Sequence, residues 1–296
     1  MEALLAIERK KYHKNLKEKK LFSISDSGIP SNADKDSLLS VAIAKEIATE
    51  LNVKTLKKLP PQTAGKIFEQ INESFLKATF PKLNFLRPGK WEIKKLGNQS
   101  NTTTSSFAQY EHLNHLNTLV EKDAELAASV GNNYMVAPDI VIYQHSFADK
   151  EINKNSLIVD NNTAKKTCIR KKNKSALILH ASISAKWTIR SDRAQNSRTE
   201  ALGLIRNRKG RLPHIVVVTG EPLPSRIASL ALGTGDIDCV YHFALDELEA
   251  AINKLEISAE NKSFDKNIKK EHKILSTLID GKRLKDISDL PLDLLL

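Results

Sequence analysis

The sequence contains two carboxylates and a lysine, Asp139, Glu200 and Lys186, that a fold could bring together. Asp139 follows Pro138 at the start of an apolar run, and Lys186 stands near the end of another such run at 177–187. Carboxylate oxygens bind divalent cations such as Mg²⁺, and a lysine neutralises negative charge that develops on a phosphorus atom. These residue types therefore suit the hydrolysis of a phosphodiester bond.

The run 177–187 alternates in polarity, which predicts a β-strand that delivers Lys186 at its carboxyl end. In open α/β sheets, ligands bind at the carboxyl ends of the strands. We expect one face of this strand to carry Leu177, Leu179, Ala181, Ile183 and Ala185, and the other to carry His180, Ser182, Ser184 and Lys186.

Helix signals follow the strand, because Ser191 is a suitable N-cap and the pattern predicts a helix over about 192–206. Arg193 and Glu200 are seven residues apart and so lie on nearly the same helix face. We therefore expect Glu200 to point toward the side of Lys186.

For an isolated aspartate and lysine, a turn cap and a solvated side chain are the ordinary interpretation. If the strand that follows Asp139 pairs with 177–187, Asp139 and Lys186 can meet. Glu200, as a third group on the same side, is the feature that favours a metal and proton-transfer site.

The corner between strand and helix carries the sequence "RSDR", with Arg190, Asp192 and Arg193. Arginine can donate two hydrogen bonds to O6 and N7 of guanine, and aspartate can accept from N4 of cytosine. This triplet suits a run of C and G in the major groove of DNA. The alternative is a surface cluster of salt bridges at the start of a helix.

Elements that position these residues can be predicted from hydrophobic periodicity. The first third of the chain favours helices at 3–19, 37–53 and 63–80, a turn and short strand within 87–97, and a further helix at 105–131 that ends at Gly131.

Short β-branched runs then alternate with helices, at 135–144, 177–187, 214–220 and 237–243. This pattern predicts an α/β fold with a central mixed sheet flanked by helices. The polar insertion 145–175 is expected to be a surface loop with some structure of its own, and the apolar tail is expected to dock on the body or on a partner subunit.

Charge and cysteine content narrow the class of protein. Lys and Arg number 46 against 35 Asp and Glu, and the resulting formal net charge of +11 points to a polyanionic partner, although many basic proteins are merely soluble. Cys168 and Cys239 form no CxxC pair, which argues against a disulfide framework or a structural zinc site. We expect a cytoplasmic protein without a membrane span.

The pattern formed by Pro138-Asp139, Ser184-Ala185-Lys186 and Glu200 resembles the PD-(D/E)xK nuclease superfamily, in the variant where serine replaces the acidic residue before the lysine and a helix supplies that carboxylate. The stretch 186–249 is similar to the tetrameric, CCGG-reading group of type II restriction endonucleases. The similarity extends with gaps from "SNAD" and "LPPQTAG" through "APDI" to "DGKRLKDISDLPLDLLL", and thus over most of the chain.

The resemblance implies a restriction-endonuclease-like fold, Mg²⁺-dependent cleavage of double-stranded DNA, and a tetramer of two back-to-back dimers that engages two DNA sites. It assigns metal binding to Asp139, Glu200 and the backbone carbonyl of Ala185, and catalysis to Lys186. A related enzyme has Cys at position 185, where Ala should serve because only the carbonyl is needed. Ser184 and Glu69, in "KIFEQ", are further expected site residues.

For DNA recognition, the resemblance assigns the CCGG core to Arg190, Asp192 and Arg193, and the outer base pairs to Arg226, Asp34 and Gln62. The expected target is the palindrome GCCGGC, cut after the first G to leave a four-base 5′ extension. A palindrome requires at least a two-fold symmetric dimer. Nothing is transferred to the insertion.

We predict one domain over 1–296, with a mostly helical part at 1–131, a catalytic and DNA-reading core at 132–256, and a C-terminal extension at 257–296. Two alternatives remain open from the sequence: a sequence-specific DNA-binding protein without cleavage, and a repair nuclease of relaxed specificity. Trp187 is expected in the core or at a subunit contact.

Overall fold

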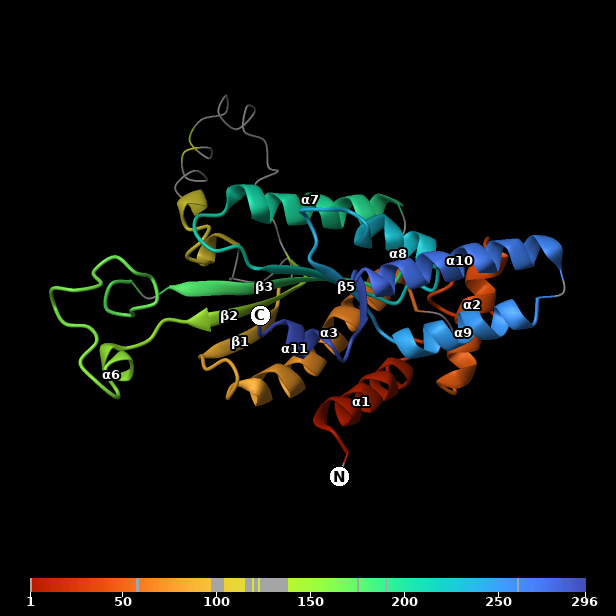
Figure 1. The fold of residues 1–296 in the computed structure, drawn as a ribbon, viewed down its shortest axis with the longest axis horizontal. Coiled ribbons are helices and arrows are strands. Elements are labelled where there is room, and N and C mark those ends of the chain that lie inside the picture. Colours follow the sequence, from red (N-terminus) through yellow and green to blue (C-terminus); the bar gives the residue numbers. More distant parts are fainter. Residues whose placement is uncertain are drawn as a thin grey trace.

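A six-stranded mixed β-sheet lies at the centre of the computed structural model (Figure 1). The structure describes residues 2–56, 59–96, 104–114, 119, 122, 138–174, 176–189, 191–259 and 261–296, with the backbone alone at 191–194. The strands follow chain order across the sheet: β1 (Trp91–Lys95), β2 (Ile140–His145), β3 (Leu177–Lys186), β4 (His214–Thr219), β5 (Cys239–His242) and β6 (Leu284–Asp286).

The sheet changes direction at β3. The pairs β1·β2 and β2·β3 are antiparallel, whereas β3·β4, β4·β5 and β5·β6 are parallel. The predicted mixed sheet with flanking helices is confirmed. The short strand β6 was not predicted from the sequence.

Helices cover both sides of this sheet, with α7 and α8 on one side and α1 and α3 on the other (Figure 1). The long helices are α1 (Leu4–Glu18), α2 (Leu38–Glu50), α3 (Pro61–Thr79), α7 (Ser191–Asn207), α8 (Pro224–Ala231), α9 (Leu245–Ile257) and α10 (Lys262–Asp280). Shorter ones are η1 (Phe80–Leu83), η2 (Thr104–Ser106), α6 (Asp149–Ile152) and α11 (Leu290–Asp293). Most of the predicted helix 105–131, with Gly131, lies outside the described residues.

The register of β2 against β3 departs from simple alternation. A shift between Ile142 and Tyr143 places Ala181 opposite the first and Leu179 opposite the second, so His180 is an extra residue. His180 accordingly contacts the ring of Phe80 and the carbonyl of Leu294, whereas Ser184 contacts α7. The prediction that His180 shares a face with Ser184 and Lys186 is wrong, because the bulge reverses the alternation.

One continuous cluster of buried apolar side chains extends from α1 to α11. Trp187 is 5% exposed and packs against the rings of Phe22, Phe68 and Phe243, so its predicted core position is confirmed. The cluster draws on all three predicted parts of the chain. The division at 131 and 256 stays a prediction.

The C-terminal tail docks on the body of the protein, which is one of the two alternatives predicted from the sequence. Leu290 and Leu294 are buried, and Arg87 donates hydrogen bonds to the carbonyls of Leu295 and Leu296 at 2.5 and 2.6 Å. Among the described residues, none of the helices combines the length and the apolar character that a bilayer span requires.

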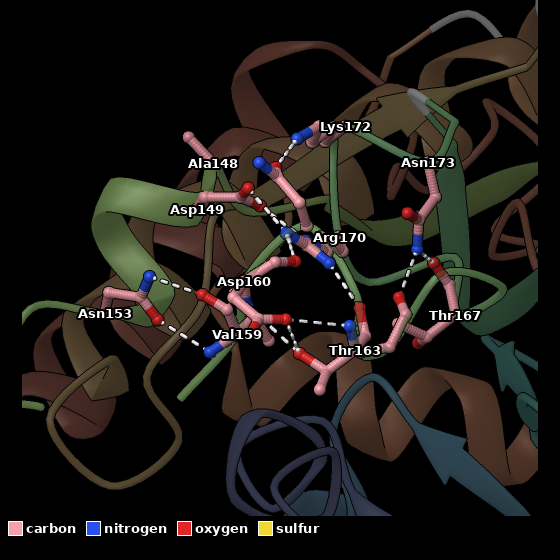
Figure 2. A network of polar contacts seen from close by, with 12 residues as sticks. Ala148, Asp149, Asn153, Val159, Asp160, Thr163, Thr167, Arg170, Lys172 and Asn173 are labelled. Atoms are coloured by element: carbon pink, nitrogen blue, oxygen red, sulfur yellow. Dashed lines mark hydrogen bonds and ion pairs between the residues drawn. The ribbon is translucent and has the colours of Figure 1, made fainter. Parts of the chain in front are cut away.

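The insertion 145–175 folds around Arg170, which is only 2% exposed (Figure 2). Its guanidinium donates to both carboxylate oxygens of Asp149, at 2.6 and 2.7 Å, and to the carbonyls of Asp160 and Thr163, both at 2.6 Å. Asp160 in turn accepts the N–H groups of Asn162 and Thr163. The prediction that this segment has structure of its own is confirmed.

Arg9 joins three elements that are distant in sequence. Its guanidinium pairs with both oxygens of Asp286, at 2.9 Å each, and with both oxygens of Glu247, at 2.9 and 2.6 Å. Both carboxylates are buried. Although burial acts to raise it, the hydrogen bonds and charge of Arg9 hold the pKa of Asp286 at about 2.

We predict that Arg9→Met lowers the free energy of unfolding by about 3–5 kcal/mol, because it leaves two buried carboxylates without their partner. Urea denaturation at neutral pH measures this. Lys10→Met is the matched control, since Lys10 is on the same helix with a side chain that is 73% exposed, and it should change stability by less than about 0.5 kcal/mol. Equal stability of the two variants would contradict the prediction.

Candidate active site

A cavity of about 570 Å³ lies at the carboxyl end of β3. Its walls come from the loop 31–34, the first turns of α3, the residues 185–188, α7 and α8. The predicted site residues that line it are Asp34, Gln62, Glu69, Ala185, Lys186, Glu200 and Arg226. The structure thus gathers into one cavity residues that are spread over much of the chain.

Asp139 and Lys186 are in direct contact. Lys186 Nζ donates to Asp139 Oδ2 at 2.9 Å, and the backbone N–H of Ala185 donates to the same oxygen at 2.8 Å. Both side chains are about one-fifth exposed, at 19% for Asp139 and 18% for Lys186. The antiparallel register that pairs Ile140 with Ile183 creates this contact, because it places Asp139 beside the last residues of β3.

Glu200 approaches the same pair from α7. Burial raises the pKa of its carboxyl, the charge of Lys186 acts to lower it, and the charge of Asp139 acts to raise it further. Two carboxylates and one ammonium group therefore share an electrostatic environment at the cavity wall.

Ser184 and Ala185 differ in where they point. The Ser184 side chain is buried, and its hydroxyl lies 3.2 Å from that of Ser197 on α7. Ser184 is outside the cavity lining, whereas Ala185 is part of it. Their predicted roles remain predictions.

Glu69 lies in the part of the cavity wall formed by α3. It has a partner that was not predicted from the sequence. Lys95 Nζ, at the end of β1, lies 2.9 Å from Glu69 Oε2. The same amine donates to the carbonyl of Lys66 at 3.3 Å. The contact joins two elements with no local sequence relation, so no motif could indicate it.

The residues present fit a hard divalent cation. Asp139, Glu200 and the carbonyl of Ala185 offer oxygen donors, which Mg²⁺ prefers, and it usually retains several waters besides. Burial is the main cause of the raised pKa of Glu200, and a cation between Asp139 and Glu200 would offset the smaller contribution from the charge of Asp139. Among the described residues, no group of three or more His, Cys, Asp or Glu side chains is arranged to hold a metal ion. The predicted ligand set accordingly has only two side chains, those of Asp139 and Glu200, besides the carbonyl of Ala185.

The corner between β3 and α7 carries the residues predicted to read the CCGG core. Arg190 and the side chains of Asp192 and Arg193 lie outside the described residues. The backbone of α7 begins at Ser191, where the sequence places its cap, and ends at Asn207.

The residues predicted to read the outer base pairs meet on another wall of the cavity. Arg226 Nη2, on α8, forms an ion pair with Asp34 Oδ2. Arg226 Nη1 lies 3.9 Å from Oε1 of Glu221. Gln62 is exposed in the first turn of α3 and also lines the cavity.

Glu221 is a residue that sequence reasoning missed. It is fully buried in the loop between β4 and α8, where its Oε2 accepts the N–H of Ile189 at 2.9 Å and its Oε1 accepts that of Leu223 at 3.3 Å. Burial raises the pKa of its carboxyl to about 7, against these two bonds and the charge of Arg226, which act to lower it. An acidic residue in a loop carries no sequence signal for burial.

Comparisons with known proteins point to one family. The family model described as NgoMIV restriction enzyme matches residues 12–296. The type II restriction enzyme NgoMIV of Neisseria gonorrhoeae is 48% identical over 295 residues, which cover 99% of each chain. A solved complex of the restriction endonuclease PspGI with substrate DNA matches with 15% identity and a TM-score of 0.27, covering 99% of this chain and 92% of that one; this similarity is too low to support an argument.

We predict that Glu221→Gln removes a pH-dependent loss of stability. Below pH 4.5 the carboxyl is protonated in both folded and unfolded chains, and between pH 4.5 and about 7 only the unfolded chain ionises. The wild type should therefore lose about 3 kcal/mol relative to the variant as pH rises through this window. Urea unfolding of both proteins at pH 4.5, 6 and 8 tests this, and a stability difference that is constant with pH would contradict it.

Proposed function

Since the chain belongs to the NgoMIV restriction enzyme family, we propose that this type II restriction endonuclease cuts double-stranded DNA at the palindrome GCCGGC, after the first G, with Mg²⁺ as its cofactor. The observation that supports the proposal most is the contact of Asp139 with Lys186, which lines the same cavity as Glu200. These groups suit phosphodiester hydrolysis, and Asp34, Gln62 and Arg226, predicted to read the outer base pairs, line the same cavity.

Each group has a distinct part in the proposed reaction. Asp139, Glu200 and the Ala185 carbonyl would hold the cation, which supplies Lewis acidity and a more acidic water when bound. Lys186 Nζ, oriented by Asp139 Oδ2, would donate to a non-bridging oxygen of the scissile phosphate and neutralise the charge that develops there. Glu69, held by Lys95, would add a third carboxylate in the cavity wall formed by α3.

Recognition would come from two sets of residues. Arg190, Asp192 and Arg193 would read the CCGG core in the major groove. Arg226, Asp34 and Gln62 would read the outer pairs, and the first two already form an ion pair in the structure. That pair would have to open, or share its hydrogen bonds, to reach a base.

The test uses purified protein and a plasmid with one GCCGGC site. With Mg²⁺ we expect a single cut whose mapped ends carry the four-base 5′ extension CCGG, and with excess EDTA we expect no cleavage. Random nicking, or cleavage at another sequence, would reject the proposed target.

Lys186→Ala serves as the variant for the proposed chemistry. It should bind GCCGGC in gel-shift assays with Ca²⁺ but cut it at least about 10²–10³-fold more slowly, because a group that stabilises developing charge is gone. Lys95→Ala, which removes a lysine outside the proposed metal site, should retain more activity than Lys186→Ala. Normal cleavage by Lys186→Ala would refute its role.

We further propose that the enzyme is a tetramer of two dimers. Each half of a palindrome needs one subunit, so a two-fold dimer is the minimum, and the resemblance implies two such dimers. Light scattering during gel filtration should then give a mass of about four times the 33.0 kDa of one chain. A mass of two chains would retain the dimer and refute the tetramer.

A further inference from the structure

We propose that Glu221 is a positioning residue for sequence discrimination, which holds the inner and the outer DNA-reading elements in a fixed relation. The inference rests on the proposed function. Glu221 is fully buried and thus cannot touch DNA, so it would act only through the elements that it binds.

The first of these elements is the corner after β3. Glu221 Oε2 accepts the N–H of Ile189 at 2.9 Å, and Ile189 is itself only 2% exposed. Ile189 directly precedes Arg190, the first residue of the predicted core-reading triplet. A buried hydrogen bond therefore fixes the backbone at Ile189, directly before that triplet.

The second element is α8, which carries Arg226. Glu221 Oε1 accepts the N–H of Leu223, the N-cap residue of this helix, at 3.3 Å. The same oxygen lies 3.9 Å from Arg226 Nη1, while Arg226 Nη2 pairs with Asp34. The Glu221 carboxylate thus contacts the backbone of Ile189, the backbone of Leu223 at the start of α8, and the guanidinium of Arg226.

The loop that holds Glu221 is anchored independently on both sides. Thr219 Oγ1 donates to the carbonyl of Lys186 at 2.8 Å and accepts the N–H of Glu221 at 3.1 Å. Asn32 donates to the carbonyl of Gly220 at 2.8 Å. A Cβ at Gly220 would lie 2.4 Å from the ring of Trp187, so only glycine lets the loop approach so closely.

A carboxylate is an unfavourable choice at this position if stability alone matters. Its raised pKa shows that burial outweighs the two N–H bonds and the nearby arginine. A neutral side chain would fill the space at lower cost. Its two oxygens contact Ile189, Leu223 and Arg226, and these contacts account for an acidic side chain at this position.

The experiment compares Glu221→Gln with a matched control, Glu271→Gln. Glu271 is also buried, and it accepts the N–H of Ser225, in the first turn of α8, at 2.8 Å. The described contacts give it no bond to the corner at Ile189. In Glu271→Gln the one remaining oxygen can still accept the N–H of Ser225. In Glu221→Gln one oxygen cannot accept both N–H groups, so the bond to Ile189 or the bond to Leu223 is lost.

The measured quantity is the ratio of kcat/KM on GCCGGC to kcat/KM on ACCGGT, which keeps the core and changes the outer pairs. We expect Glu221→Gln to lower this ratio about tenfold, with kcat on GCCGGC within about threefold of wild type, because one outer contact discriminates by about 10–100-fold. Glu271→Gln should leave the ratio unchanged.

Two results would overturn the inference: an unchanged ratio in Glu221→Gln, or an equal fall in both variants, which would indicate general loosening of α8. If Glu221→Gln does not fold, as judged by circular dichroism, Glu221→Asp replaces it. Aspartate retains the charge but is too short to reach both N–H groups, so the ratio should again fall. A wild type with no preference for GCCGGC would instead refute the proposed function, before any variant is compared.

Discussion

The pairing of β2 with β3 is the constraint on which the rest of the site depends. Its antiparallel register delivers one carboxylate oxygen of Asp139 to both the N–H of Ala185 and the amine of Lys186. A slip by one residue would send Lys186 to the opposite face of the sheet. The bulge at His180 lies several residues before Lys186 on β3, and its side chain contacts Leu294 in the C-terminal tail. The pairing of Ile140 with Ile183 beyond the bulge is regular.

The carboxylates of this fold differ in pKa according to their burial and their partners. Asp286 and Glu247 share the two-pronged guanidinium of Arg9, and the pKa of Asp286 is held at about 2. Glu221 has mainly backbone N–H partners, with Arg226 at a longer distance, and its pKa lies near 7. Burial is the main cause of the raised pKa of Glu200; the charge of Lys186 acts to lower that pKa and the charge of Asp139 acts to raise it further. The contacts of Arg9 with Asp286 and Glu247 join α1, α9 and β6. Glu200, in contrast, lines the cavity, and Glu221 lies 3.9 Å from Arg226, which is also part of the lining.

Much of this arrangement could be predicted because it follows from local patterns. Five of the six strands, the helix from Ser191, and the meeting of Asp139 with Lys186 depend on periodicity and on one strand pairing. The short strand β6 was missed because three residues carry no periodicity, and the bulge at His180 was missed because it depends on the partner strand. The contact of Lys95 with Glu69 and the burial of Glu221 arise from tertiary packing alone, which no spacing in the chain records.

The insertion folded around Arg170 joins the end of β2 at His145 to the start of β3 at Leu177, whereas Asp139 and Lys186 occupy the opposite ends of the same two strands. With a rise of about 3.3 Å per residue, the root of the insertion is about 20 Å from the contact between Asp139 and Lys186. Its cohesion comes from its own arginine and its own turns. A change in the length or sequence of this segment therefore acts at the end of the two strands that is remote from Asp139 and Lys186.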